Sequence, residues 1–271
     1  MLSPKVTIIV LNWNGNEVVI NCLKSLAKIK TENVDILLVD NNSTDGSKEK
    51  IQKLYPNINL LALNKNYGYA GGNNKGVQSI SDAKPEYICF LNNDTVVRSN
   101  FIDHLLIAVE KYGKNKIYGP KIFFMDNPNI IWYNGGNVEL ERGIINHEGI
   151  GVEDSETISE NKITNYITGC CLFLHWDLFI QLNGFDTRFN MYGEDVDLCL
   201  RAKYNGVGCN VVSDSVIFHE VSSSLGGRYS LRKQIKKMKA IRLLAGIHCP
   251  QKSKNIIMLK MLVNSIKNII N

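Results

Sequence analysis

The sequence predicts an α/β protein with a mostly parallel central sheet and helices on both of its faces. Four short segments are apolar almost throughout, as strands are when both faces of their sheet are covered: 6–11, 34–39, 58–63 and 87–91. Three segments between them have the length and apolar spacing of helices: 17–27, 47–55 and 72–80. This alternation is typical of parallel strands joined by crossover helices, and ligands of such sheets bind beyond the carboxyl ends of the strands.

The pattern changes after Tyr112. The next fifty residues are rich in Gly and Asn and carry turn signals, which predict short strands. Further along we expect a strand over 166–174, a short helix over 176–182, a helix over 193–204 and strands over 207–212 and 216–218. The chain is therefore predicted to form one α/β body over residues 1–227, with a less regular second half, followed by an extension over 228–271.

The charge of the chain separates these two parts. The 271 residues are 44% hydrophobic and 21% charged, which excludes a disordered or collagen-like chain. The formal net charge is +5, but residues 1–227 hold 20 Lys and Arg and all 26 Asp and Glu, whereas residues 228–271 hold 11 Lys and Arg and no acid. An acidic body and a basic extension need separate explanations.

Three features predict a cytoplasmic protein. No apolar run approaches the ~18 residues that span a bilayer. The first residues lack the basic and then apolar leader of a secreted protein. The seven cysteines form no CxxC pair, so free thiols are expected rather than a disulfide framework or a zinc site.

Polar clusters follow each of the first four predicted strands, at 12–15, 40–47, 66–74 and 92–95. Each cluster alone is weak, because Asn, Asp and Gly are also ordinary turn and cap residues, and Ser43 and Ser47 are equally well explained as helix caps. Because the carboxyl ends of parallel strands meet at one edge of the sheet, the four clusters together predict a binding site there.

The residue types limit the chemistry that this site can support. The sequence contains no GxxxxGK[ST] loop, and the glycines of 68–72 lack GxGxxG spacing, which excludes a P-loop and argues against a dinucleotide fold. Asp40 can accept a hydrogen bond from a base, Trp13 offers either an apolar face for a base or a core tryptophan, and Asp94 suits Mg²⁺ or Mn²⁺. Gly71 and Gly72 allow close backbone approach. A nucleotide diphosphate held by a metal fits these parts.

The second half adds candidate catalytic groups. Glu194, Asp195 and Asp197 fall in the first turn of a predicted helix, where acids complement the helix dipole in any case. For Asp197 the dipole is sufficient explanation, whereas the polar approach through 190–193 favours a functional role for Asp195. His219 ends a predicted strand; a lone histidine is more often structural.

Seven segments occur in the order found in one enzyme family: TIIVLNWNG, VDNNSTDGS, NYGYAGGNN, FLNNDT, TGCCLFL, GFDTRFNMYGEDVDLCLR and FHEVSSS. Through them residues 5–227 resemble the inverting nucleotide-sugar glycosyltransferases of family 2, which have the GT-A fold. Within that family the chain most resembles the rhamnosyltransferase-like branch of bacteria and archaea. The resemblance favours dTDP-rhamnose as donor, with UDP-hexoses behind it, and leaves acceptor, linkage and oligomeric state open.

The resemblance implies residue roles. The nucleotide-sugar donor would be bordered by Leu11, Asn12, Trp13, Asp40, Asn66, Gly71, Asn74, Asn92 and Asn93. Asp94 and His219 would bind a divalent metal, Mg²⁺ or Mn²⁺. Asp195 would be the catalytic base, supported by Glu194, and Thr168 and Gly169 would lie near the acceptor, a glycan or lipid-linked molecule of cell-surface polysaccharide assembly. Asn92-Asn93-Asp94 occupies the place of the family's DxD motif, and the chain departs from it at the first Asp, which is Asn92 here. This removes charge from the metal site and predicts weaker divalent-metal binding or partial metal independence.

The basic extension has two interpretations. Residues 230–245 place apolar side chains on one helical face, namely Leu231, Ile235, Met238, Ile241 and Leu244, and a second apolar segment follows Pro250. A basic amphipathic helix predicts peripheral association with an anionic membrane surface, and the alternative is a helix packed on the body with a solvated basic face. Nucleic-acid binding is not expected, because the extension has one aromatic residue, Tyr229, and no recognisable fold.

Two other functions remain to be weighed against a glycosyltransferase. A sugar nucleotidyltransferase would need basic residues in the loop after the first strand, and NWNGNEVV has none. A non-catalytic nucleotide-sugar binding module would not need Asp195, Asp94 and His219 together.

Overall fold

The computed structural model describes residues 4–154, 161–221, 231–251, 255–260 and 263. Its helices are α1 (Asn16–Leu26), α2 (Ser47–Leu54), α3 (Gly68–Ser79), α4 (Phe101–Tyr112), α5 (Trp176–Gln181), α6 (Glu194–Tyr204), α7 (Leu231–His248) and the 3-10 helix η1 (Leu140–Arg142). Its strands are β1 (Val6–Asn12), β2 (Val34–Asp40), β3 (Asn59–Ala62), β4 (Tyr87–Asn92), β5 (Thr95–Val97), β6 (Lys116–Phe124), β7 (Ile131–Tyr133), β8 (Gly136–Glu139), β9 (Ile144–His147), β10 (Lys162–Thr164), β11 (Cys171–His175) and β12 (Gly208–His219). The predicted α/β class is confirmed.

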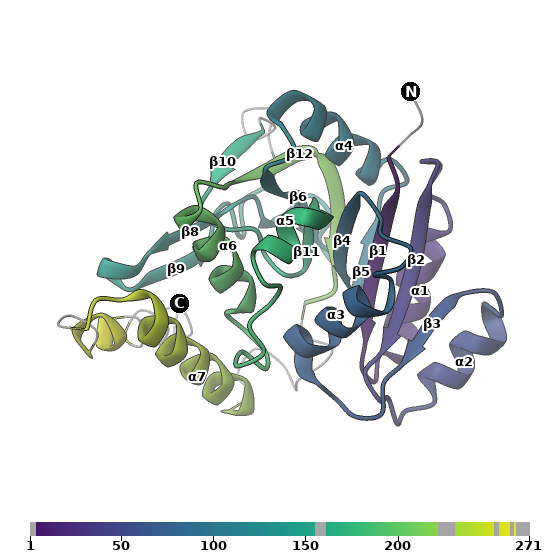
Figure 1. Cartoon of the computed structure of the whole chain (residues 1–271), viewed down its shortest axis with the longest axis horizontal. Coiled ribbons are helices and arrows are strands. Elements are labelled where there is room, and N and C mark those ends of the chain that lie inside the picture. Colours follow the sequence, from purple (N-terminus) through teal and green to yellow (C-terminus); the bar gives the residue numbers. More distant parts are fainter. Residues whose placement is uncertain (1–3, 155–160, 222–230, 252–254, 261–262, 264–271) are drawn as a thin grey trace.

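One mixed sheet, parallel in its two main blocks, organises the chain (Figure 1). Its order is β10-β12-β6-β11-β4-β1-β2-β3, with β5 on β12 and β7 on β6. The strands β3, β2, β1 and β4 are parallel to one another, and so are β6 and β12. The strand β11 is antiparallel to both of its neighbours and so joins the two blocks.

The strand order reverses at β1, and this reversal positions the site. The chain moves from β1 to β2 to β3 in one direction and then returns to β4 on the other side of β1. Since such crossovers are right-handed, the reversal places α1 and α3 on opposite faces of the sheet, as Figure 1 shows. A crevice opens at the carboxyl ends of the two strands that flank such a reversal, here β1 and β4.

Several predicted elements have different boundaries in the structure. The helix predicted over 72–80 begins four residues earlier, at Gly68, and α4 was not predicted. The strand predicted over 166–174 begins only at Cys171, because residues 168–171 form a turn in which the Cys171 N–H donates to the Thr168 carbonyl at 3.3 Å. The two strands predicted over 207–212 and 216–218 are one strand, β12, with an irregularity between Val212 and Val216.

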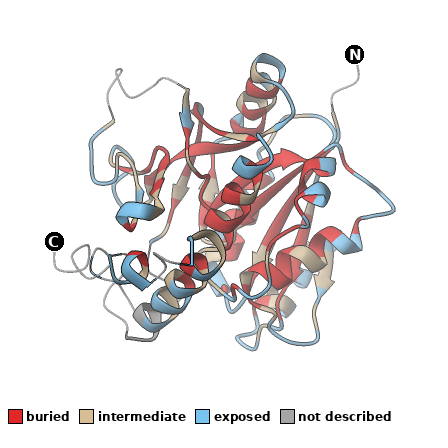
Figure 2. Cartoon of the chain, turned by 60° about the vertical axis from the view of Figure 1, so that its left-hand side comes forward, coloured by how far each residue is buried: buried red, intermediate tan, exposed pale blue. Residues whose placement is uncertain are grey.

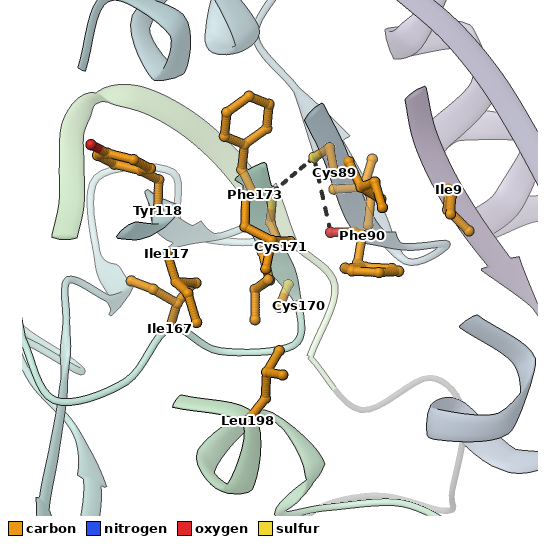
Figure 3. Packing of buried hydrophobic residues seen from close by; sticks show 14 of the residues in the cluster. Ile9, Cys89, Phe90, Ile117, Tyr118, Ile167, Cys170, Cys171, Phe173 and Leu198 are labelled. Atoms are coloured by element: carbon orange, nitrogen blue, oxygen red, sulfur yellow. Dashed lines mark hydrogen bonds between the residues drawn. The ribbon is translucent and has the colours of Figure 1, made fainter. Parts of the chain in front are cut away.

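The hydrophobic core lies between the sheet and its helices (Figures 2 and 3). Figure 2 shows continuous burial along the central strands. In the close view, Cys89 of β4 and Cys171 of β11 face each other, with their sulfurs 3.7 Å apart, and Leu198 of α6 lies below Ile167 and Cys170. Six of the seven cysteines, all but Cys249, are buried free thiols, and burial raises the pKa of Cys170 and Cys171 well above the usual value. These thiols are therefore core side chains.

The helix α7 packs on the body. Ala240, Leu244 and Ala245 are buried, whereas Ile235 and Met238 are 44% and 49% exposed. Of the predicted apolar stripe, Leu244 is buried and Ile241 packs against the core, so the stripe packs on the body only in its C-terminal half. Ser230 together with the side chain of Leu231 lies outside the described residues. The predicted boundary at residue 227 also falls in an undescribed segment. Within the described part of the chain, no helix combines the length and apolarity needed to cross a membrane.

Candidate active site

Asn12 connects three of the predicted polar clusters. It ends β1 and is fully buried. Its Nδ2 donates to Asp40 Oδ1 at 3.2 Å and to Ser47 Oγ at 3.1 Å, and its Oδ1 accepts from Asn93 Nδ2 at 2.8 Å. The ends of β1, β2 and β4 are thus joined through one amide side chain. Asn12 and Asp40 shape this edge of the sheet from within, since both are almost wholly buried.

Trp13 lies at the mouth of this edge. Its side chain is 38% exposed, which rules out a core tryptophan. It lines a pocket of about 260 Å³ together with Asn93 and residues 14–18. An exposed aromatic ring beside a pocket at the carboxyl end of β1 is suited to a planar base.

The segment after β3 is built around Asn41, which sequence reasoning did not select. Asn41 Nδ2 donates to Asn66 Oδ1 and to the Gly68 carbonyl, both at 3.1 Å, and its Oδ1 accepts from the Tyr67 N–H at 2.8 Å. The Asn66 side chain also accepts from the Gly68 N–H at 2.7 Å. These bonds satisfy backbone groups at the start of α3 and explain its early beginning.

The glycines and Asn74 of α3 serve packing in this structure. A Cβ at Gly72 would lie 2.5 Å from Leu11 Cδ1, and one at Gly71 would lie 2.9 Å from Tyr67 Cβ. Asn74 donates to the Phe185 carbonyl at 2.7 Å and accepts from the Phe185 N–H at 3.0 Å, so both ends of its amide are engaged. These residues hold Leu11 and the loop before α6 in place around the site.

The candidate metal ligands Asp94 and His219 come together across two strands. Asp94 immediately precedes β5, and β5 pairs with β12 so that His219 lies opposite Thr95. His219 Nε2 lies 3.3 Å from Asp94 Oδ1, and both side chains are largely enclosed. The Trp132 ring, another residue that sequence reasoning missed, packs against the His219 ring with centroids 4.4 Å apart.

The chemistry of this pair fits a divalent cation. Asp94 Oδ1 and His219 Nδ1 are buried without a hydrogen-bond partner among the described residues. A carboxylate oxygen and an imidazole nitrogen are both ligands of Mn²⁺, and diphosphate oxygens could complete the set. The described residues contain no cluster of three or more His, Cys, Asp or Glu that could bind a metal without such help. Asn92, which replaces a carboxylate of the DxD motif, uses its backbone to bond Cys170 and Thr95.

Asp195 lies in the first turn of α6, with its carboxylate held by backbone donors. Asp195 Oδ2 accepts from the Gly169 N–H at 2.8 Å, and Oδ1 accepts from the Val196 N–H at 2.8 Å. Desolvation raises the pKa of Asp195 above its usual 3.8, against the lowering effect of these backbone bonds. Burial and the charge of Asp195 raise the pKa of neighbouring Glu194 well above its usual value, and Glu194 Oε2 has no hydrogen-bond partner in the described chain.

The turn at 168–171 links the candidate base to the metal side of the site. Its Gly169 N–H bonds Asp195, while its Cys170 carbonyl accepts from the Asn92 N–H at 2.9 Å. Tyr69, which was not selected from the sequence, donates its hydroxyl to the Gly169 carbonyl at 2.6 Å. One turn therefore contacts α6, β4 and α3 at the same point.

The backbone before α6 is strained. Tyr192 and Gly193 both have left-handed φ angles, 71° and 88°, and this conformation is unfavourable for a tyrosine. The two residues turn the chain so that Glu194 and Asp195 begin the helix. Such strain persists where surrounding contacts determine the conformation, which is common in functional loops.

Curated relatives are similar in sequence to this chain over about three quarters of its length. An N-acetylglucosaminyl-diphospho-decaprenol L-rhamnosyltransferase of Mycobacterium tuberculosis is 27% identical over 223 residues, covering 74% of this chain and 72% of the relative. A rhamnosyltransferase of Escherichia coli K12 is 27% identical over 215 residues, covering 75% and 79%.

Solved structures share the fold. GalNAc-T7 with UDP, GalNAc and Mn²⁺ superposes with a TM-score of 0.70 at 15% identity, covering 89% of this chain and 47% of that one. A mannosyltransferase of Pyrobaculum calidifontis with GDP-Man and Mn²⁺ gives 0.63 at 14% identity, covering 96% and 70%. The model of the family described as glycosyl transferase family 2 matches residues 7–181. The chain belongs to family 2 of the glycosyltransferases, with the GT-A fold and a rhamnosyltransferase-like sequence.

Proposed function

We propose that this enzyme transfers a sugar, with inversion, from a nucleotide-diphosphate donor to a hydroxyl of a glycan or lipid-linked acceptor in cell-surface polysaccharide assembly. The observation that carries the proposal is the turn at 168–171, which bonds Asp195 through Gly169 and the end of β4 through Cys170. These two bonds support the proposal because they connect the candidate base to the end of the strand that leads to the candidate metal ligand Asp94.

The residues support a single displacement. Asp195 accepts the proton of the acceptor hydroxyl while that oxygen attacks the anomeric carbon from the side opposite the diphosphate. Desolvation keeps its pKa above that of an ordinary aspartate, which makes it a stronger base. The Gly169 and Val196 N–H groups fix the direction of its carboxylate. A divalent cation on Asp94 and His219 would supply positive charge against the negative charge of the leaving diphosphate.

The donor proposed first is dTDP-rhamnose, with UDP-sugars as the second choice. Two of the relatives above have rhamnosyltransferase names, and a relative from Shigella flexneri, 22% identical over 220 residues, is a dTDP-rhamnosyl transferase. Trp13, exposed beside the pocket, is the proposed contact for the base.

A panel of nucleotide sugars tests this assignment by thermal unfolding. We expect dTDP-rhamnose with Mn²⁺ to stabilise the protein most, because a ligand at 100 times its Kd adds about 2.7 kcal/mol to the free energy of unfolding. dTDP-glucose, UDP-glucose and UDP-GlcNAc at equal concentration serve as controls for the sugar and the base. Preferential stabilisation by one UDP-sugar would reassign the donor, and stabilisation by none would contradict the proposal.

The outer face of α7 is proposed to contact an anionic membrane surface. Ile235, Met238, Lys239 and Arg242 are exposed at i, i+3, i+4 and i+7 spacing, so they share one helical face. The extension carries 11 basic residues and no acid. Two apolar side chains among cations suit the interface of a bilayer that contains anionic lipid. This placement agrees with a cytoplasmic enzyme, which the six buried free cysteines also favour.

Vesicle binding tests the outer face. We expect the double variant Lys239→Gln, Arg242→Gln to bind vesicles of mixed phosphatidylglycerol and phosphatidylcholine about thirtyfold more weakly, since each basic residue near such a surface contributes about 1 kcal/mol. Co-sedimentation measures the change. Lys24→Gln with Lys28→Gln removes two exposed charges, one in the last turn of α1 and one just after the helix, and should have little effect. Equal losses in both double variants would show that the outer face of α7 has no particular role.

A further inference from the structure

The inner face of α7 contacts the loop and the helix that present Asp195. Leu244 packs against Gly193, since a Cβ added at Gly193 would lie 3.2 Å from Leu244 Cδ1. Lys236 Nζ lies 3.9 Å from Met191 Sδ, and Lys237 Nζ lies 5.8 Å from the centre of the Tyr192 ring. The three contacts fall on consecutive residues before Glu194, including the two with left-handed backbone. Figure 1 shows α7 running below α6.

The polar contact at the end of α7 is buried. His248 Nε2–H donates to Asp197 Oδ1 at 2.8 Å, and the two side chains are 2% and 1% exposed. Arg201 Nε donates to Asp197 Oδ2 at 2.8 Å, so both carboxylate oxygens are satisfied. Arg201 also donates to the Leu182 and Gly184 carbonyls, which ties the group to the chain before the loop.

The position of Asp197 makes this contact relevant to the site. It lies two residues after Asp195 in the same helical turn, and its N–H donates to the Gly193 carbonyl at 2.8 Å. The helix dipole alone accounts for an acid here, but a buried carboxylate also needs partners, because an unpaired one is costly. Without His248, one oxygen of Asp197 would be buried and unpaired.

We infer that α7 belongs to the catalytic apparatus, and that His248 is a positioning residue that holds the α6 N-terminus, and with it Asp195, through Asp197. The inference rests on the proposed role of Asp195. It gives the basic extension two faces with separate tasks: the outer one meets the surface on which the acceptor lies, and the inner one sets the direction of the base.

Variants at His248 test the inference in the whole chain of 271 residues. We expect His248→Ala to lower kcat by about ten- to a hundredfold, with the donor KM within about twofold of wild type, since small displacements of a catalytic group have effects of this size. His248→Gln should restore most of kcat, because its amide N–H can replace the Nε2 donor. His104→Ala, on α4 away from the site, is the matched control.

Hydrogen exchange provides a second measurement that needs no substrate. Amides of residues 189–197 should exchange faster in His248→Ala than in wild type, and close to the wild-type rate in His248→Gln and His104→Ala. Unchanged exchange at 189–197 would overturn the inference whatever happens to kcat, and so would faster exchange with kcat within twofold of wild type. If no nucleotide sugar binds, the proposed function fails while the exchange result still decides whether His248 holds this segment.

Discussion

Asp195→Asn is expected to abolish sugar transfer while leaving donor binding intact. The amide keeps the size of the side chain and can still accept one of the two backbone hydrogen bonds, from Gly169 or Val196. It cannot take a proton from the acceptor, and loss of a general base costs about 10²- to 10⁴-fold in rate. Transfer kinetics and calorimetric titration with the donor measure the two properties separately.

The pH dependence of the wild-type enzyme should agree with this assignment. Asp195 acts only when deprotonated, so activity is lost as pH falls through its pKa. Because desolvation raises that pKa above 3.8, the acidic loss occurs at a higher pH than for an ordinary aspartate. Asp214→Asn alters an exposed carboxylate on β12 and should change neither rate nor profile. Turnover retained in Asp195→Asn would assign the base to another residue.

Asp94→Asn and His219→Ala are expected to lower transfer by about a hundredfold each at limiting Mn²⁺, the size of effect seen when one group that stabilises developing charge is removed. Each substitution removes one of the two protein ligands of the candidate cation site. Asp94 is the one carboxylate of the candidate pair, so the metal should be bound weakly enough for a chelator to remove it. We therefore expect a chelator to reduce wild-type activity and added Mn²⁺ to restore it.

Two measurements separate metal binding from misfolding in these variants. Raising Mn²⁺ should recover part of the activity of His219→Ala, because Asp94 remains, and the unfolding temperature without metal should stay near that of wild type. Asp126→Asn, at an exposed carboxylate, is the control. Full activity of the wild-type enzyme in excess chelator would show that Asp94 and His219 act without a metal.

Local patterns predicted the first half of the fold well. Continuous apolar runs identify strands that are covered on both faces, and the polar residues that follow them had to meet at one edge because the strands are parallel. The bonds of Asn12 to Asp40 and Asn93 confirm that meeting. The sequence could not show which polar side chains face the crevice. Asn74 was predicted to border the donor, but its amide is engaged by the backbone of Phe185, which lies 111 residues further along the chain.

The packing of α7 shows a second limit. Ranking side chains by hydrophobicity selected Ile235, Met238 and Leu244, but only Leu244 of these is buried, and its buried neighbours on the helix are Ala240 and Ala245. Small side chains allow a helix to approach the body closely. How much contact results depends on the shape of the surface opposite the helix. The buried bond between His248 and Asp197 depends likewise on two segments fifty residues apart. Neither can be seen in the helical periodicity of one segment.

The irregularity in β12 determines on which side of the sheet its last residue projects. Val212 and Val216 pair with consecutive residues of β6, Pro120 and Lys121, so three residues of β12 have no counterpart in its neighbour. Side chains of a strand alternate between faces, and an odd number of extra residues inverts the alternation for everything that follows. The number of extra residues here, four to six positions before His219 in the same strand, therefore decides that His219 faces Asp94 instead of the opposite layer. A family member with one residue more or fewer at this point would need a compensating change to keep the same pair.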